Sequence, residues 1–235
     1  MRRGRVITLD ALGTLVALDD PVPRLVAGLA DRGAAVDAAQ AAAALAEEIA
    51  FYRAGHDAAV DAVTLALLRA RCAEVLRAGL ERAGARVDAV GADAMVEVLL
   101  GALRFTPYPE VPAALAELRA AGHRLVVVSN WDVSLHDMLR TTGLGVLVDA
   151  AISSAEAGVR KPDPAIFRRA LALAGAAAHG DRPALHAGDS LELDVAGARA
   201  AGLAAVLIAR DGVPAGVPGD VVVLGSLDGL AELAA

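Results

Sequence analysis

Short apolar runs and longer amphipathic stretches alternate along much of the chain. Six runs rich in Val, Ile and Leu are too short for helices and are typical of buried parallel strands, the weakest being the third: 5–10, 124–129, 147–152, 184–187, 204–208 and 220–224. Between them the pattern predicts helices over 110–121, 133–141, 164–174, 192–201 and 227–233. Gly122, Gly143, Gly175 and Gly202 follow four of these helices, where a C-cap favours glycine. This alternation predicts an open α/β fold with a Rossmann-like parallel sheet and helices on its faces.

Residues 20–105 interrupt this alternation. They are rich in Ala, Leu, Arg and Glu and contain no clear strand run, and they predict helices over 37–54, 61–83 and 91–104. Two prolines within 106–109 prevent the last helix from continuing. We therefore expect an all-helical insert after the first strand, at 19–105, and an α/β core made of 1–18 and 106–235.

Composition narrows the possible partners and the compartment. The chain has 235 residues, a net charge of −7 and only 3% aromatic residues, which argues against a nucleic-acid or anionic-membrane partner. A single cysteine, Cys72, fits a reducing compartment, and we expect it to be a buried or half-buried helix residue. The basic N-terminus leads into an apolar run that Asp10 and Gly13 interrupt too early for a signal peptide. No stretch reaches the ~18 apolar residues of a membrane span. We expect a cytoplasmic protein with no membrane partner.

Polar side chains follow three of the predicted strands. Asp10 ends the first strand, Ser129 and Asn130 end the second, and Asp189 follows the run at 184–187, with Asp194 one helical turn further on. In an open parallel sheet, ligands bind beyond the carboxyl ends of the strands, so these groups are expected on one rim. A loop before the helix at 164–174 contributes Lys161.

This set of groups suits chemistry on a phosphoryl group. A carboxylate such as Asp10 can act as a nucleophile, but a phosphoryl dianion repels it unless a cation lies between them. Mg²⁺ takes hard oxygen ligands, and Asp10 and Asp189 are the candidates. The Ser129 hydroxyl and the N–H groups after it could hold phosphoryl oxygens, and Lys161 would supply a compact positive charge.

Four motifs in order resemble those of the haloacid dehalogenase-like (HAD) hydrolase superfamily. They are DALGTL at 10–15, VVVSN at 126–130, VRKPDP at 159–164 and GDSLELD at 188–194, the last followed by GARAAG at 197–202. The helical insert stands where the superfamily places a type-1 cap. The resemblance implies that Asp10 is the nucleophile and a Mg²⁺ ligand, that Ser129 binds phosphate, that Lys161 steadies the charge and that Asp189 binds the metal. It makes Asp194 an acidic partner of the metal or the lysine.

Asn130 and Thr14 are expected to contact the substrate because they neighbour the phosphate-binding serine and the nucleophile along the chain. The substrate itself is expected to be a small phosphorylated molecule, and the sequence does not predict the oligomeric state.

One position departs from the superfamily pattern. Its phosphatases usually carry a second aspartate two residues after the nucleophile, which protonates the leaving group and activates water. Here that residue is Leu12, which cannot exchange a proton. Loss of a general acid/base costs roughly 10²–10⁴ in rate. The Leu12 carbonyl can still bind the metal, since the usual ligand at this position is the carbonyl.

Three functions stay open at this point. The first is a Mg²⁺-dependent, phosphatase-like hydrolase that prefers good leaving groups such as acyl or aryl phosphates. The second is a 2-haloacid dehalogenase, because halide departs without a proton. The third is a non-catalytic protein that uses the fold for binding. Phosphonate cleavage through a second lysine is excluded, because Lys161 is the only lysine. The only asparagine, Asn130, also stands at the expected site, which weighs against a non-catalytic scaffold.

Several other polar residues have simpler interpretations. Asp163 and Pro164 read as a helix N-cap and first-turn proline. In the insert, Glu48, Tyr52 and His56 share one helix face beside Arg53. They form either a solvated face or interhelical contact, or else Tyr52, Arg53 or His56 recognises the substrate. The other histidines show no metal-ligand spacing, so no zinc site is expected: His123, His136, His179 and His186.

Overall fold

The computed structural model describes residues 4–175 and 183–234, so His179 lies outside the described residues. These residues divide into two compact units, which we describe separately. One unit joins the chain up to Ala17 with the segment from Thr106 onward, and the other runs from Leu18 to Phe105. No helix of the described residues has the length and apolar character needed to cross a membrane.

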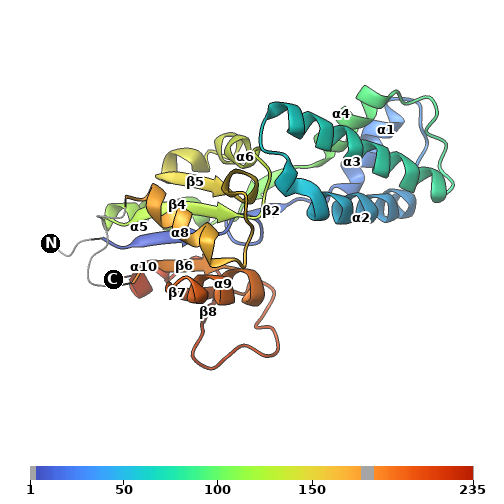
Figure 1. Cartoon of the computed structure of the whole chain (residues 1–235). Coiled ribbons are helices and arrows are strands. Elements are labelled where there is room, and N and C mark those ends of the chain that lie inside the picture. The colour runs from blue at the N-terminus through green and yellow to red at the C-terminus, as the bar shows by residue number, and fades with distance from the viewer. Residues whose placement is uncertain (1–3, 176–182, 235) are drawn as a thin grey trace. The chain divides into compact units, whose positions relative to one another are not determined.

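The first unit is built on one six-stranded sheet in which every neighbouring pair is parallel (Figure 1). From one edge to the other the strands are β5 (Ala150–Ser153), β4 (Arg124–Ser129), β1 (Val6–Leu9), β6 (Leu185–Gly188), β7 (Ala204–Ile208) and β8 (Val222–Leu224). The side chains of the four inner strands β4, β1, β6 and β7 are almost all buried, because helices cover both faces of a parallel sheet. This confirms the α/β fold expected from the sequence.

Helices pack on both faces of this sheet. On one face, apolar residues of α8 (Pro164–Leu173), the π-helical turn η4 (Leu191–Ala196) and α9 (Gly197–Ala200) share a core with Val126 and Val128 of β4. Side chains alternate along a strand, so Leu125 and Val127 point to the other face. The remaining helices of this unit are α5 (Val111–Ala120), α6 (Leu135–Thr141), α7 (Ser154–Ala157), α10 (Leu230–Ala234) and the 3₁₀ turn η2 (Leu144–Leu147).

Local sequence explains where several of these helices begin and end. The Asp163 carboxylate accepts a hydrogen bond from the Ala165 N–H at 2.8 Å and Pro164 fills the first turn, which confirms the predicted N-cap of α8. The four glycines predicted as C-caps all have φ between 75° and 86°. A residue with a side chain would be strained in this left-handed conformation.

The second unit is helical, as the sequence predicted. Its elements are α1 (Val22–Ala30), α2 (Ala38–Gly55), η1 (His56–Ala58), α3 (Ala62–Arg82) and α4 (Ala92–Ala102). Helix α1 was not among the helices predicted from the sequence; Pro21 is its N-cap and Pro23 lies in its first turn, where proline is tolerated. Gly79 lets α3 approach α2 closely, since a Cβ there would lie 2.9 Å from the Cα of Ala44.

The polar face of α2 lies partly inside this helical unit. Glu48 and His56 are both buried, and the rings of Tyr52 and His56 lie 5.3 Å apart. Burial raises the pKa of Glu48, against the opposing effect of a hydrogen bond with the thiol of Cys72. Cys72 is buried in α3, as expected, so Glu48 makes an interhelical contact.

A second, two-stranded sheet joins β2 (Val16–Leu18) to β3 (Phe105–Pro107), where the chain leaves and re-enters the α/β unit. From the sequence we predict only that the two prolines within 106–109 end the last helix of the insert. Each strand has three residues, which is too short for periodicity to reveal.

Candidate active site

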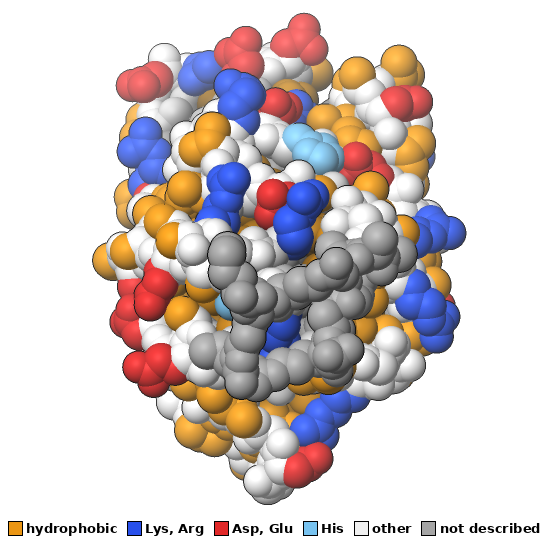
Figure 2. Space-filling model, turned by 90° about the vertical axis from the view of Figure 1, so that its left-hand side faces the viewer, with side chains coloured by type: hydrophobic (Ala, Val, Ile, Leu, Met, Phe, Trp, Pro, Cys, Tyr) orange, Lys and Arg blue, Asp and Glu red, His pale blue; other side chains and the backbone are white. Residues whose placement is uncertain are grey.

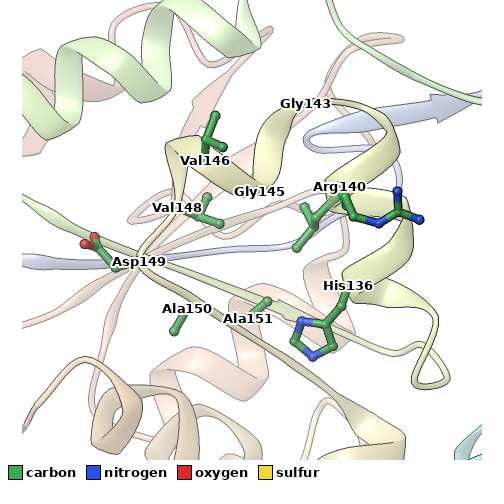
Figure 3. Close-up of a pocket in the computed structure, with 10 residues that line it drawn as sticks. His136, Arg140, Gly143, Gly145, Val146, Val148, Asp149, Ala150 and Ala151 are labelled. Carbon is green, nitrogen blue, oxygen red and sulfur yellow. The ribbon is translucent and has the colours of Figure 1, made fainter.

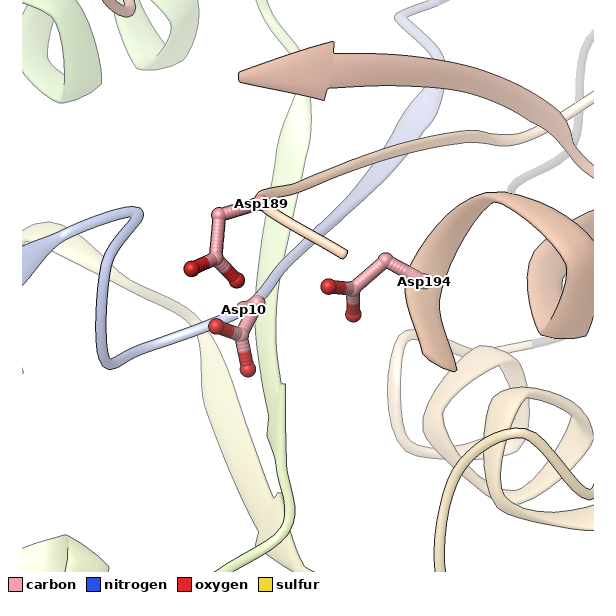
Figure 4. A group of neighbouring side chains, drawn as sticks. All are labelled: Asp10, Asp189 and Asp194. Atoms are coloured by element: carbon pink, nitrogen blue, oxygen red, sulfur yellow. The ribbon is translucent and has the colours of Figure 1, made fainter. Parts of the chain in front are cut away.

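Three carboxylates and a lysine meet at the carboxyl ends of the central strands. Asp10 follows β1, and its N–H donates to the carbonyl of Ala187 at 3.0 Å, which anchors it to β6. Asp189 directly follows β6, and Asp194 comes from the π-helical turn η4 (Figure 4). One oxygen from each of these three side chains lies within 4.8 Å of the others. The rim predicted from the strand ends is therefore formed.

Lys161 bridges two of these carboxylates. Its side chain is only 3% exposed, and Nζ donates to Asp10 Oδ1 at 2.5 Å and to Asp194 Oδ1 at 2.6 Å. Burial alone would lower the pKa of Lys161, but the two carboxylates more than offset it and raise that pKa. Lys161 is thus a fixed positive charge beside Asp10.

The surroundings of Asp10 raise its pKa and place both hydrogen-bond donors on one of its two oxygens. Burial is the largest influence and raises the pKa of Asp10 to about 6, opposed by Lys161 and reinforced by Asp194 and Asp189. Ser129, the last residue of β4, donates its hydroxyl to Asp10 Oδ1 at 3.1 Å. Both donors bind Oδ1, and Asp10 Oδ2 receives no hydrogen bond from any described residue.

Asp194 is fully engaged by hydrogen bonds. Its Oδ1 lies 3.0 Å from His186 Nε2 in addition to Lys161, and its Oδ2 accepts from the Ser190 N–H at 3.0 Å. Burial would raise the pKa of Asp194, but Lys161 and the hydrogen bond from His186 lower it. The main-chain N–H groups of Asp194 and Val195 both donate to the Ser190 carbonyl, which produces the π-helical turn that presents this carboxylate.

Asp189 contrasts with Asp194. It forms no salt bridge among the described residues, and burial together with the nearby Asp194 raises its pKa. Gly13 makes room for it, because a Cβ at that position would lie 2.1 Å from Asp189 Oδ2. Asp189 and Asp10 Oδ2 are thus hard oxygen donors with no cation partner in the described structure. Together they fit a divalent cation.

Asn130 holds the lysine loop in place. Its Nδ2 donates to the Lys161 carbonyl at 3.1 Å, and its Oδ1 accepts from the Lys161 N–H at 2.8 Å. Both ends of this amide are used on the main chain of one residue. From the sequence we predict that Asn130 contacts the substrate; the structure shows this positioning role, and substrate contact stays a prediction.

The loop after Asp10 contains the other two predicted residues. Thr14 is fully buried, its hydroxyl has no hydrogen-bond partner among the described residues, and its substrate contact likewise stays a prediction. Leu12 is 38% exposed. The hydrogen bonds that close the loop use the carbonyls of Ala11 and Val16 and leave that of Leu12 unused within this described segment.

Two further residues, neither of them predicted from the sequence to belong to the site, support it. Arg210 follows β7 and donates to the carbonyls of Gly13 and Thr14 at 3.0 and 2.6 Å, and to Glu110 at 2.8 Å. Its guanidinium also lies 3.4 Å from the centre of the Tyr108 ring. His186, which the sequence analysis considered only as a zinc ligand, contacts Asp194. A lone histidine within an apolar strand was the available signal.

A surface cavity of about 350 Å³ lies elsewhere, beside the edge strand β5 (Figure 3). His136, Arg140 and Asp149 contribute its polar lining, and none of the carboxylates at the strand ends takes part. Another face of the molecule carries acidic and basic side chains interspersed with apolar ones (Figure 2). This cavity is distinct from the strand-end site, which consists of Asp10, Lys161, Asp189 and Asp194.

Comparison with known proteins identifies relatives of this chain. The profile of a family described as "haloacid dehalogenase-like hydrolase" matches residues 5–202. Over 138 residues the chain is 37% identical to the phosphoserine phosphatase of Thermus thermophilus, covering 58% of this chain and 53% of that enzyme. Over 99 residues it is 43% identical to bovine haloacid dehalogenase-like hydrolase domain-containing protein 3, covering 41% of this chain and 38% of that protein.

The alignments therefore span about half or less of those two relatives. A solved 2-haloacid dehalogenase from Pseudomonas syringae pv. Tomato superimposes along almost the entire chain, with a TM-score of 0.65, 26% identity and coverage of 99% of this chain and 98% of that one. The family profile covers far more than half of the sequence. The chain belongs to the haloacid dehalogenase-like hydrolase family.

Proposed function

We propose that this protein is a Mg²⁺-dependent hydrolase of a small phosphorylated metabolite, with Asp10 as its nucleophile. The observation that carries the proposal is the arrangement of charge around Asp10. Lys161 binds one of its oxygens, while the other oxygen and the Asp189 carboxylate have no cation partner in the described structure. Asp10, Asp189 and the Leu12 carbonyl would hold the metal, which when bound supplies positive charge that lets a phosphoryl dianion approach a carboxylate.

The chain's own residues then perform a two-step displacement. The Asp10 carboxylate attacks phosphorus, the bond to the leaving group breaks, and an aspartyl phosphate forms. Water hydrolyses that intermediate and restores Asp10. Ser129, which donates to Asp10 at 3.1 Å, is placed to bind a phosphoryl oxygen, and Lys161 offsets the charge on Asp10 and the phosphoryl group.

Leu12 limits which leaving groups the phosphorylated substrate can carry. An apolar side chain stands where a proton donor for the leaving group is usually found, and the residue is 38% exposed. A leaving group that departs as a stable anion needs no proton. We therefore infer a preference for acyl or aryl phosphates over alkyl phosphates.

The helical unit is proposed to be a cap that determines which substrate binds. Within it, Tyr52, Arg53 and His56 are the candidates for substrate recognition. The cap consists of residues 19–105, and the reaction itself is proposed to take place at the strand-end site.

A 2-haloacid dehalogenase is the second candidate. It is supported by the similarity to the Pseudomonas syringae enzyme and by Leu12, since halide also leaves without a proton. The unpaired Asp189 favours the metal-dependent alternative. A non-catalytic binding role is the third possibility, and it would leave the buried bridge between Lys161 and Asp10 without a chemical use.

One assay separates the three functions. Purified protein is incubated with p-nitrophenyl phosphate or with 2-chloropropionate, each with Mg²⁺ or with EDTA. The proposal expects phosphate release that requires Mg²⁺ and is lost in Asp10→Asn. Chloride release in EDTA would replace it with the dehalogenase, and no turnover of either compound would favour the binding role.

A further inference from the structure

His186 lies in the middle of a buried polar chain that leads to the site. It belongs to β6, is fully buried, and its ring meets the edge of Phe167 at 5.0 Å between centroids. Nε2 lies 3.0 Å from Asp194 Oδ1, and Nδ1 lies 2.9 Å from the hydroxyl of Thr8. Thr8 and His186 are register partners on the neighbouring strands β1 and β6, so the sheet itself fixes this contact.

The direction of the contact with Asp194 follows from its chemistry. A carboxylate only accepts hydrogen bonds, so the His186 Nε2–H is the donor. The oxygen that receives it is the same Oδ1 that binds Lys161 at 2.6 Å. His186 on Oδ1 and the Ser190 N–H on Oδ2 together fix this carboxylate, and Oδ1 is one of the two oxygens that hold the ammonium group.

Core packing alone does not explain why a histidine occupies this position. This position lies between a sheet and the apolar side of α8, where Phe167 packs, and an aliphatic side chain would avoid burying two polar nitrogens. The ring is instead held by Thr8 on one side and aimed at Asp194 on the other. Such contacts rigidify a buried network and fix the geometry of the groups at its end.

We propose that His186 is a positioning residue that holds Asp194 so that Lys161 stays against the nucleophile Asp10, with Thr8 fixing the imidazole ring. For its effect on turnover the inference rests on the function proposed above. Its structural part, the placement of Lys161, does not depend on which substrate the protein uses.

Two substitutions distinguish this role from simple core packing. Glutamine places an amide nitrogen near the position of Nε2, whereas asparagine reaches only as far as Nδ1. With p-nitrophenyl phosphate and Mg²⁺, His186→Gln is expected to keep kcat within about threefold and His186→Asn to lower it by about 10- to 100-fold, with KM little changed in both. Phe167→Leu is the control, because it loosens the packing around His186 and removes no hydrogen bond.

The single lysine provides a readout that needs no turnover. Labelling with ¹⁵N-lysine gives one side-chain ammonium signal, that of Lys161. We expect this signal to stay at its wild-type position in His186→Gln and in Phe167→Leu, and to shift in His186→Asn. Circular dichroism confirms that each variant is folded.

The outcomes separate the two proposals. If the wild-type protein turns over neither test compound and the Lys161 signal still shifts only in His186→Asn, the positioning role holds and the proposed function fails. The positioning role is overturned if Gln and Asn move the signal equally, if neither moves it, or if Phe167→Leu reproduces the loss of kcat.

Discussion

Gly13 is the point at which the loop after the nucleophile approaches the proposed metal ligand Asp189, so its substitution tests the metal site directly. An alanine Cβ at Gly13 would lie 2.1 Å from Asp189 Oδ2 and 2.7 Å from Cγ. Ordinary contact begins near 3.4 Å, so the carboxylate has to turn away. Asp189 is exposed and can turn toward solvent, but it then leaves its place beside Asp10, and a Mg²⁺ ligand must stand at about 2.0–2.1 Å from the ion.

Backbone strain must be separated from this collision. Gly13 has φ of 84°, and alanine in the left-handed region costs about 1–2 kcal/mol. Gly122 is a matched control, because its φ is 86° and no atom lies within 4 Å of a Cβ built there. We expect both Gly13→Ala and Gly122→Ala to lower the free energy of unfolding by about the cost of this strain. Only Gly13→Ala also displaces a proposed metal ligand.

The expected difference is in metal affinity. Changes to the groups that orient a metal ligand typically cost about 10- to 100-fold in metal affinity, and we expect Gly13→Ala to weaken Mg²⁺ binding by about 10- to 100-fold, or about 1.4–2.7 kcal/mol. Isothermal titration calorimetry with Mg²⁺ measures this affinity, and urea unfolding in EDTA measures the strain. Wild-type affinity in Gly13→Ala would refute our placement of the metal, and so would equal weakening in Gly122→Ala.

Three further changes test other parts of the site and the fold. Leu12→Asp is expected to raise kcat on an alkyl phosphate by about 10²-fold or more, measured as phosphate release, whereas Leu12→Asn, which has no acid to offer, should not. Arg210→Met leaves Glu110 without its cation partner and removes the Arg210 donor from two loop carbonyls, and urea unfolding should show a loss of about 2–3 kcal/mol, partly restored in Arg210→Lys. Burial, with the charge of Arg5, lowers the pKa of His123, whose Nδ1 accepts the Arg5 N–H at 3.0 Å. The unfolded chain therefore binds the proton more readily. The contribution of His123 to stability is therefore full above pH ~6.5 and falls as the pH drops below it, and the difference between wild type and His123→Gln in urea unfolding at several pH values measures it.

The sheet could be predicted because strands buried on both faces appear in the sequence as short continuous apolar runs. The run at 124–129 coincides with β4, and the run at 204–208 coincides with β7. The run at 147–152 was less accurate, because β5 begins only at Ala150 and ends at Ser153. Its first residues instead close the 3₁₀ turn before the strand, which a count of apolar residues does not distinguish from a strand.

The contents of the site were only partly predictable. Residues that end strands could be placed on one rim, because parallel strands share a carboxyl edge. The contact between Arg210 and Gly13 joins residues far apart in sequence and depends on side-chain geometry that no local pattern records. For His186 the sequence contains only a weak signal. Strands β1 and β6 each carry one polar residue at the same register position, Thr8 opposite His186.

The geometry of the bridge explains why the chain keeps a lysine where nearly every other cation is arginine. Of the 22 basic residues, all but Lys161 are arginines. Nζ of Lys161 is a single atom that reaches oxygens of two different carboxylates, at 2.5 and 2.6 Å, inside a space that leaves 3% of its side chain exposed. A guanidinium is a planar fork that binds two oxygens of one carboxylate side by side, and it is too wide to take the place of that one atom. The position therefore requires a point charge, and the requirement arises only if Asp10 and Asp194 must share one cation.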